Sequence, residues 1–143
     1  EGALLRGLTG QAARLARPPV SDFFVGAVAL GDSGQVYLGV NLEFPGLPLH
    51  HSVHAEQFAI VNSLHAGEPS LKALAVNAAP CGHCRQFMCE LHGAERLRVL
   101  VGERGDHGLH DLLPFNFRPE DLQGEEAVLV FHRISNQLEW APG

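Results

Sequence analysis

The feature that most constrains this fold is a pair of short motifs that must come together in space. The first is Val53-His54-Ala55-Glu56-Gln57, and the second is Pro80-Cys81-Gly82-His83-Cys84-Arg85-Gln86. Together they offer one imidazole, two thiols and one carboxylate. A zinc ion with three protein ligands keeps its fourth position open for water, which is typical of a catalytic rather than a structural site. We therefore predict a zinc centre formed by His54, Cys81 and Cys84.

Both motifs are predicted to open helices. Apolar spacing indicates one helix from Val53 to Ala66 and another from Gly82 to His92. Helix N-termini favour negative charge, so they would stabilise the thiolates of Cys81 and Cys84, which a three-residue spacing places on one side. Glu56 lies two residues beyond the histidine. It can reach the water of a zinc site without binding the metal, and we expect it to carry a proton.

Other interpretations of these residues are weaker. A structural zinc site usually has four ligands, and no fourth ligand stands at a regular spacing. A redox C-x-x-C pair would leave the histidine and the glutamate unexplained. His83 should point away from the metal, and Cys89 should be a small buried thiol, because five residues turn it off the ligand face of its helix. His50 and His51 are the histidines whose role is most open.

Composition limits the class of protein. A chain of 143 residues can bury ~70% of its unfolded surface, and we expect one domain over residues 1–143. Ten Lys+Arg against 16 Asp+Glu, a net charge of −6, weighs against nucleic acid as a partner. We find no apolar run that could span a membrane and no signal-peptide pattern. Three cysteines, two of them in a metal motif, favour a reducing, cytoplasmic compartment.

The order of the predicted elements indicates the fold class. Strands that alternate with helices after an opening hairpin predict an α/β fold, a three-layer α/β/α sandwich with a mixed five-stranded sheet. Ligands would then gather beyond the strand ends, at the helix N-termini. The opening helix is expected at Leu4–Leu15, and the strands at Phe23–Leu30, Gln35–Val40, Leu71–Asn77, Leu97–Val101 and Ala127–His132.

These residues also carry a family resemblance. An H-x-E motif followed by P-C-x-x-C is typical of zinc-dependent base deaminases. The stretch from Phe23 to Val101 closely resembles cytidine deaminases, and in particular the dimeric bacterial and plant branch that uses one His and two Cys ligands. Besides the two motifs, the specific matches are Phe23 to Ala29, Asn41 to Phe44, and parts of the segment from Leu113 to Leu122. Chains of this branch usually continue into a second, non-catalytic repeat.

The resemblance implies a binding site for a nucleoside. Phe23 would pack on the pyrimidine ring, and Asn41 with Glu43 would hold the 3′-hydroxyl of the sugar. An amide beside a carboxylate suits a hydroxyl group. Without the resemblance, Asn41 would be interpreted as a strand-end residue and Phe23 as part of the core.

Four further roles follow from the same resemblance. The backbone N–H of Ala55 would meet the ring 2-carbonyl oxygen, and the carbonyl of Ala79 would receive the exocyclic amine. Relatives often carry Ser or Thr at the position of Ala79, so a backbone role survives here and a hydroxyl role does not. Arg85 would donate to a zinc thiolate. Phe117 would close the pocket of a neighbouring subunit, with capping of its own core as the alternative.

The resemblance thus implies a hydrolase acting on cyclic amidines. It would deaminate cytidine and 2′-deoxycytidine to uridine and 2′-deoxyuridine with zinc as cofactor, a step of pyrimidine salvage. The expected partners are a small pyrimidine nucleoside and further copies of this chain, with no nucleic acid and no membrane. The alternatives are a deaminase of polynucleotides or of another base, and a non-catalytic zinc-fold module. A gripped 3′-hydroxyl argues against the first, and the intact Glu56 argues against the second.

Overall fold

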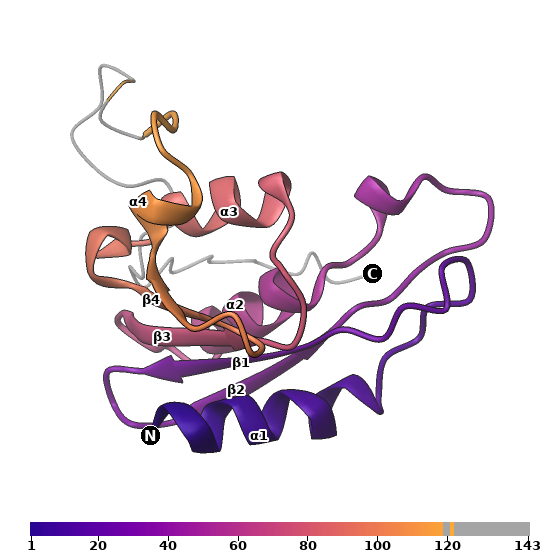
Figure 1. The fold of residues 1–143 in the computed structure, drawn as a ribbon, viewed down its shortest axis with the longest axis horizontal. Helices are drawn as coiled ribbons and strands as arrows, with labels where there is room; N and C mark the ends of the chain where they lie inside the picture. Colours follow the sequence, from indigo (N-terminus) through magenta and orange to yellow (C-terminus); the bar gives the residue numbers. More distant parts are fainter. Residues whose placement is uncertain (119–120, 122–143) are drawn as a thin grey trace, which may run out of the picture.

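The computed structural model describes residues 1–118 and 121. At its centre is a five-stranded sheet with the strand order β2-β1-β3-β4-β5 (Figure 1). Strands β3 and β4 pair in parallel, and the other neighbours pair antiparallel. The strands are β1 (Gly26–Gly31), β2 (Val36–Val40), β3 (Leu71–Val76), β4 (Arg98–Val101) and β5 (Asp106–Gly108).

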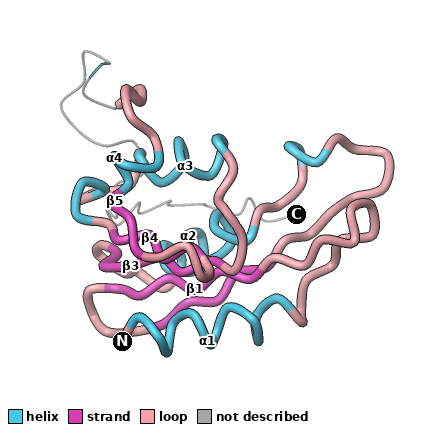
Figure 2. Tube along the Cα trace, viewed as in Figure 1, coloured by secondary structure: helices cyan, strands magenta, loops and turns pink. Residues whose placement is uncertain are grey.

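Helices cover both faces of this sheet. Helix α1 lies along one face, and α2 and α3 lie on the other (Figures 1 and 2). No helix in the described part of the chain is long and apolar enough to cross a membrane. The helices are α1 (Gly2–Ala13), α2 (Ala55–His65), α3 (Gly82–Cys89) and α4 (Leu109–Leu112), with 3₁₀ turns at Leu49–His51 and Ala94–Arg96.

The alternation of side chains along β1 explains the three layers. All six residues of β1 are buried. Val28 and Leu30 pack with Leu5 on the α1 face, while Ala27 and Ala29 belong to the core cluster on the α2 and α3 face. Successive strand residues point to opposite faces, so a strand buried throughout must be covered twice. The predicted α/β/α sandwich with a mixed five-stranded sheet is confirmed.

Two glycines let the helices lie close against the sheet. A Cβ atom on Gly26 would overlap the backbone of α1 at Thr9. A Cβ atom on Gly39 would overlap the carbonyl oxygen of Ala55 and the amide nitrogen of Ala59. Only glycine permits such an approach of two backbones. The contact at Gly39 fixes the first turn of α2, which begins directly after His54, against strand β2.

Several element boundaries differ from those expected. The strand predicted from Phe23 begins at Gly26, and the helix predicted to reach His92 ends at Cys89. At the end of α3, the N–H groups of Glu90 and Leu91 bond to the carbonyls three residues back, which tightens the turn and stops the helix. The strand expected at Ala127–His132 lies outside the described residues.

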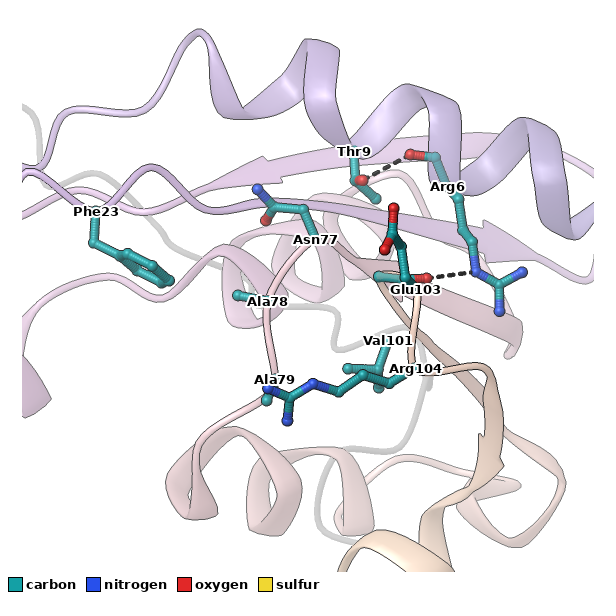
Figure 3. Close-up of a pocket in the computed structure, with 10 residues that line it drawn as sticks. Arg6, Thr9, Phe23, Asn77, Ala78, Ala79, Val101, Glu103 and Arg104 are labelled. Carbon is teal, nitrogen blue, oxygen red and sulfur yellow. Dashed lines mark hydrogen bonds between the residues drawn. The ribbon is translucent and has the colours of Figure 1, made fainter.

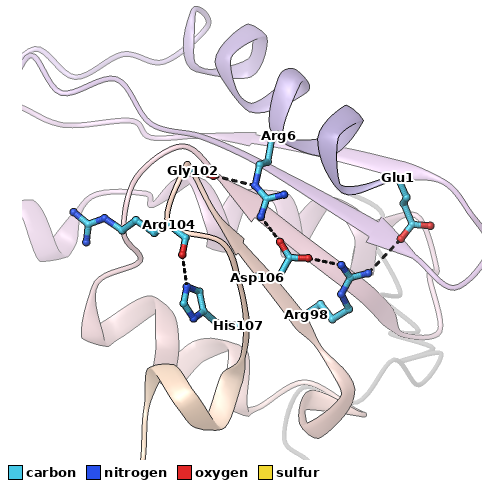
Figure 4. Close-up of polar contacts among 7 residues, drawn as sticks. All are labelled: Glu1, Arg6, Arg98, Gly102, Arg104, Asp106 and His107. Atoms are coloured by element: carbon cyan, nitrogen blue, oxygen red, sulfur yellow. Dashed lines mark hydrogen bonds and ion pairs between the residues drawn. The ribbon is translucent and has the colours of Figure 1, made fainter.

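The fifth strand of the observed sheet, β5, is polar, and its sequence gives no strand pattern. An ion-pair network holds it in place (Figure 4). Asp106 accepts from both Arg6 and Arg98, and Arg98 also pairs with Glu1 at 3.8 Å. The Arg6 guanidinium donates to the carbonyl oxygen of Gly102 at 2.9 Å. Hydrogen bonds from the two arginines lower the pKa of Asp106. The network joins α1 to β4 and β5.

Candidate metal centre and active site

The three predicted zinc ligands lie together between two helix N-termini. His54 is the N-cap of α2, Cys81 is the N-cap of α3, and Cys84 is in the first turn of α3. Nδ1 of His54 is 3.4 Å from each cysteine Sγ, and the three ligand atoms lie within 4.8 Å of one another. A tetrahedral zinc ion with bonds of about 2.1 and 2.3 Å would place nitrogen and sulfur about 3.6 Å apart. The donor set therefore fits zinc.

The orientation of the His54 ring is fixed from its other nitrogen. Nε2 lies 3.3 Å from the carbonyl oxygen of Leu49, in the 3₁₀ turn before α2. Only a protonated Nε2 can donate to a carbonyl, so this contact selects the tautomer that leaves the Nδ1 lone pair for a metal. The carbonyl of Leu49 is a part of the site that the sequence could not reveal, because a backbone acceptor carries no residue signature.

The burial of the two thiols differs. Cys81 is exposed and Cys84 is fully buried. Burial raises the pKa of the Cys84 thiol strongly, and the Glu56 carboxylate and Cys81 beside it raise the pKa further. Such a thiol holds its proton unless a cation is present, and a coordinating metal removes that proton outright. The helix N-termini act in the same direction as the metal, because they favour negative charge.

Glu56 is a buried carboxyl group beside this donor set. It is 5% exposed and occupies the second position of α2. Burial raises the pKa of Glu56 above its ordinary value, and the hydrogen bonds of its own backbone amide and of Cys84 offset that rise only in part. A carboxyl group with a raised pKa is suited to accept a proton and give it back near neutral pH.

Two asparagine side chains, one from each neighbouring strand's end, bind the segment that leads into the start of strand β1. Asn41, directly after β2, donates to the carbonyl of Phe23 at 2.8 Å and accepts the N–H of Val25 at 2.9 Å. Asn77, directly after β3, donates to the carbonyl of Phe24 at 3.1 Å and accepts the N–H of Gly26 at 2.9 Å. Side chains here take the place of part of the backbone ladder, which explains why the strand itself begins later than the sequence predicts.

The Glu43 carboxylate accepts hydrogen bonds from the turn that precedes Phe23. Its Oε2 accepts the N–H groups of Val20 at 3.0 Å and Ser21 at 2.8 Å, and its Oε1 accepts the Ser21 hydroxyl. Burial alone would raise the pKa of Glu43, but these hydrogen bonds lower it below its usual value. Leu42, next to Glu43, exchanges two hydrogen bonds of 3.0 Å with Val53, and this pairing brings the segment beside the metal ligands.

A cavity of about 870 Å³ lies at the carboxyl ends of β3 and β4 (Figure 3). Phe23 is at one end of it, and Asn77, Ala78 and Ala79 form the wall between β3 and α3. Phe23 is 59% exposed, so it is not the core residue that its apolar character alone would suggest. The three metal ligands do not line this cavity. Its lining residues Ala78 and Ala79 directly precede Pro80 and Cys81 in the sequence.

The remaining predicted residues occupy different surroundings. Ala55 is 1% exposed and begins α2. The two described hydrogen bonds of the Arg85 side chain go to the carbonyl oxygens of Pro80, at 2.9 Å, and Leu112, at 2.7 Å, and not to a thiolate. Its role at a thiolate stays a prediction. Phe117 is 51% exposed and lies beyond α4, where the chain extends away from the sheet (Figure 1).

Cys89 and three histidines lie close to the candidate metal ligands in the sequence without belonging to the donor set. Cys89 is buried, as expected, and donates to the carbonyl of Arg85 at 3.3 Å. The ring of His83 is exposed, with its centroid 5.8 Å from that of His54. His50 and His51 are exposed in the 3₁₀ turn and contact each other edge to face. Among the described residues, only His54, Cys81 and Cys84 form a group that could hold a metal ion.

The mixed sheet, the three-ligand donor set at two helix N-termini and the buried glutamate define a zinc-dependent deaminase-type domain. A family model of the cytidine and deoxycytidylate deaminase zinc-binding region matches residues 6–101. The chain belongs to this family.

The curated relatives of this chain are named as cytidine deaminases. The cytidine deaminase of Shewanella sp. (strain MR-4) is 45% identical over 139 residues, which cover 97% of this chain and 47% of that protein. Cytidine deaminase 1 of Arabidopsis thaliana is 42% identical over 149 residues, which cover 95% of this chain and 50% of that protein. The chain thus spans about half the length of the curated relatives it matches.

Solved structures with this fold include shorter proteins. The cytidine deaminase of Mycobacterium tuberculosis is 36% identical with a TM-score of 0.72, and the match covers 80% of this chain and 95% of that chain. The cytidine deaminase of Burkholderia pseudomallei is 31% identical with a TM-score of 0.70, covering 80% and 98%. The fold therefore occurs both as nearly the whole of a short chain and as about half of a longer one.

Proposed function

We propose that this chain is a catalytic domain, over residues 1–143, that deaminates cytidine and 2′-deoxycytidine hydrolytically to uridine and 2′-deoxyuridine. The observation that carries the proposal is the buried carboxyl group of Glu56 beside a three-ligand zinc site. The names of the relatives agree with it. The reaction would serve pyrimidine salvage. The free thiols of Cys81, Cys84 and Cys89 support a reducing, cytoplasmic location.

In this mechanism one side chain moves protons twice. When bound by His54, Cys81 and Cys84, zinc acts as a Lewis acid that makes a water molecule acidic near neutral pH. Glu56 accepts a proton from that water and gives it to the ring nitrogen, while the oxygen adds to the ring carbon that carries the amine. Glu56 then takes the remaining proton from the added hydroxyl group and delivers it to the amine, so that the ring carbonyl forms, the carbon–nitrogen bond breaks, and ammonia leaves. Water and cytidine are thus converted to uridine and ammonia.

The hydrogen-bonding capacity left on Asn41 and Glu43 suits a sugar hydroxyl. A carboxylate offers about four acceptor sites and an amide nitrogen has two hydrogens. Glu43 uses three sites on Val20 and Ser21, and Asn41 uses one N–H on Phe23. One acceptor and one donor then remain for a hydroxyl group, which donates once and accepts once. We assign this pair to the 3′-hydroxyl.

The base would be held by one aromatic ring and two backbone groups. The exposed ring of Phe23 can stack on a pyrimidine. The N–H of Ala55 belongs to the first turn of α2, where a helix cannot satisfy its own donors, and would bind the 2-carbonyl oxygen. The carbonyl of Ala79 would accept from the exocyclic amine. Arg85, anchored on the carbonyl of Pro80, would support the Cys81 loop.

The substrate assignment is tested by ammonia release. We expect rapid release from free cytidine and 2′-deoxycytidine and none from a cytosine oligonucleotide, because a 3′-hydroxyl bound by Asn41 and Glu43 leaves no path for a continuing strand. Cytosine without a sugar is the matched control for the sugar contacts and should react slowly. Release from the oligonucleotide at a rate equal to that from cytidine would contradict the assignment to free nucleosides.

We also infer that copies of this chain associate, at least as a dimer. Phe23 is 59% exposed, and the exposed thiol of Cys81 lies at the metal centre, so the described site is open to solvent. A site for a small ligand must exclude water around it. Phe117 and Phe115 extend beyond α4 and are 51% and 104% exposed. Such exposed aromatic residues are suited to contact a partner.

Phe117→Ala tests this association. It should raise the KM for cytidine and weaken self-association in sedimentation, because the ring would complete the neighbouring pocket around Phe23. A loss of roughly 1–2 kcal/mol in substrate binding, on the order of tenfold in KM, is expected for an aromatic contact of this kind. Phe115→Ala is the neighbouring control, and zinc content should be unchanged in both variants. A fully active monomer that is indifferent to Phe117→Ala would show that each chain builds its pocket alone.

A further inference from the structure

Ser21 lies in the turn before Phe23, and its hydroxyl contacts two groups at once. The hydroxyl donates to Oε1 of Glu43 at 2.5 Å and accepts the backbone N–H of Phe23 at 3.1 Å. The N–H of Ser21 donates to the other oxygen of the same carboxylate at 2.8 Å. Two consecutive hydrogen bonds therefore connect the buried carboxylate of Glu43 to the backbone of the exposed aromatic residue.

The backbone of Phe23 is held on both sides. Its N–H is bound by Ser21, and its carbonyl accepts the Asn41 amide at 2.8 Å. Between Ser21 and Phe23, Asp22 adopts a φ of 53°, in the left-handed region, which is unfavourable for a residue other than glycine. The surrounding hydrogen bonds maintain this conformation, and one of them runs from the N–H of Asp22 to the carbonyl of Pro18 at 3.0 Å.

The side chain of Phe23 is more than half exposed although its backbone is fixed. A fixed backbone limits the motion of the ring, so less entropy is lost when a flat ligand stacks on it. A binding site gains precision when its residues are supported in this way by further hydrogen bonds. The cavity at which Phe23 lies gives such a ligand a place beside the ring (Figure 3).

We propose that Ser21 is a positioning residue for the Phe23 ring. Its hydroxyl transmits the fixed position of Glu43 to the aromatic surface on which the base stacks. The inference rests on the proposed cytidine deaminase function and extends it: the residue assigned to the sugar, Glu43, also holds the turn that carries the base platform. Sugar recognition and base stacking are thereby parts of one hydrogen-bonded unit.

The chain offers a matched control at the opposite end of β1. Ser33 donates its hydroxyl to Glu68 at 2.6 Å and its N–H to the same carboxylate at 2.9 Å, and it accepts the N–H of Gln35 at 3.2 Å. Ser33 thus makes the same three kinds of hydrogen bond as Ser21, here around the buried carboxylate of Glu68, which is 2% exposed. It does not line the cavity beside Phe23. Ser33→Ala therefore removes the same chemistry outside the site.

The test compares steady-state kinetics of the full chain. Ser21→Ala should raise the KM for cytidine about tenfold, since a hydrogen bond to a charged acceptor is worth roughly that factor. The kcat should change little, because the ring would contact the base in both the ground state and the transition state. Ser21→Thr, which keeps the hydroxyl, should retain the wild-type KM. Ser33→Ala should lower the melting temperature as Ser21→Ala does, and leave KM unchanged.

A double-mutant cycle assigns the effect to the ring. In a Phe23→Ala background, Ser21→Ala should add no further rise in KM, because Ser21 acts through that ring. Additive effects of the two substitutions, or an equal rise in KM for both serine variants, would overturn the proposal.

Hydrogen exchange at the Phe23 amide separates this inference from the proposed function. Exchange should be faster in Ser21→Ala than in the wild type, and unchanged in Ser21→Thr and Ser33→Ala. If the wild-type protein released no ammonia from cytidine, the proposed function would fail, and exchange would still decide on the position of Phe23. Unchanged exchange in Ser21→Ala would overturn the role of Ser21 whatever the substrate.

Discussion

Glu56→Gln should abolish nearly all deamination of cytidine while the protein keeps its fold and its zinc. The amide has almost the same shape as the carboxyl group but cannot accept a proton and return it. General acid–base catalysis contributes ~10²–10⁴-fold in typical enzymes, and here one group would transfer protons at two stages. The fall in kcat should therefore lie at the upper end of that range or beyond it. Ammonia release, metal analysis and thermal melting of the same preparation provide the measurement.

The pairing of lost turnover with retained metal is the informative part of this result. The side chain of Glu56 is buried, so removal of a charge that burial disfavours should leave the melting temperature equal or higher. A variant that lost zinc as well would place Glu56 among the ligands. Near wild-type turnover would refute the proton-transfer role.

Cys84→Ala should lose zinc and stability together. The thiol of Cys84 is fully buried and is one of the three proposed ligands, and two ligands would not hold the ion firmly. A ligand present at ~1,000 times its dissociation constant stabilises the folded state by about 4 kcal/mol, and the variant should forfeit an amount of this order. Zinc per chain, expected to be close to one in the wild type, and denaturant unfolding with and without a chelator are the measurements.

Cys89→Ala is the control on the same helix. Cys89 is also buried in α3, but its thiol donates to the carbonyl of Arg85 instead of facing the metal. This variant should keep its zinc, and its unfolding should still respond to the chelator. Full zinc retention in Cys84→Ala would remove that residue from the ligand set.

The sequence predicted the metal centre more completely than the pocket around it. His54, Cys81 and Cys84 could be assigned because metal ligands need particular side chains at particular spacings, and both motifs precede apolar-periodic helices. The contact from Leu49 to His54 could not be predicted, because its acceptor is a backbone carbonyl.

The sequence predicted those helices and strands whose buried residues produce a regular apolar pattern. The buried strand at Leu71 was expected almost to the residue, whereas the polar strand β5 was not expected at all, since Asp106 and its arginines replace the apolar pattern. The strand boundary at Gly26 was misplaced because side chains of Asn41 and Asn77 bind the segment before it. Partners that lie 16 and 51 positions away leave no local signal.

The positions of the metal ligands along the chain also have a consequence for the order of folding. His54 and the two cysteines are 27 and 30 positions apart, and strand β3 lies between them. A loop that contains this strand must close before the ligands meet. A chain emerging from the ribosome holds His54 well before Cys84, so the donor set cannot assemble until β3 and the start of α3 have been synthesised. Metal uptake followed during synthesis would therefore report when the chain up to Cys84 has become available.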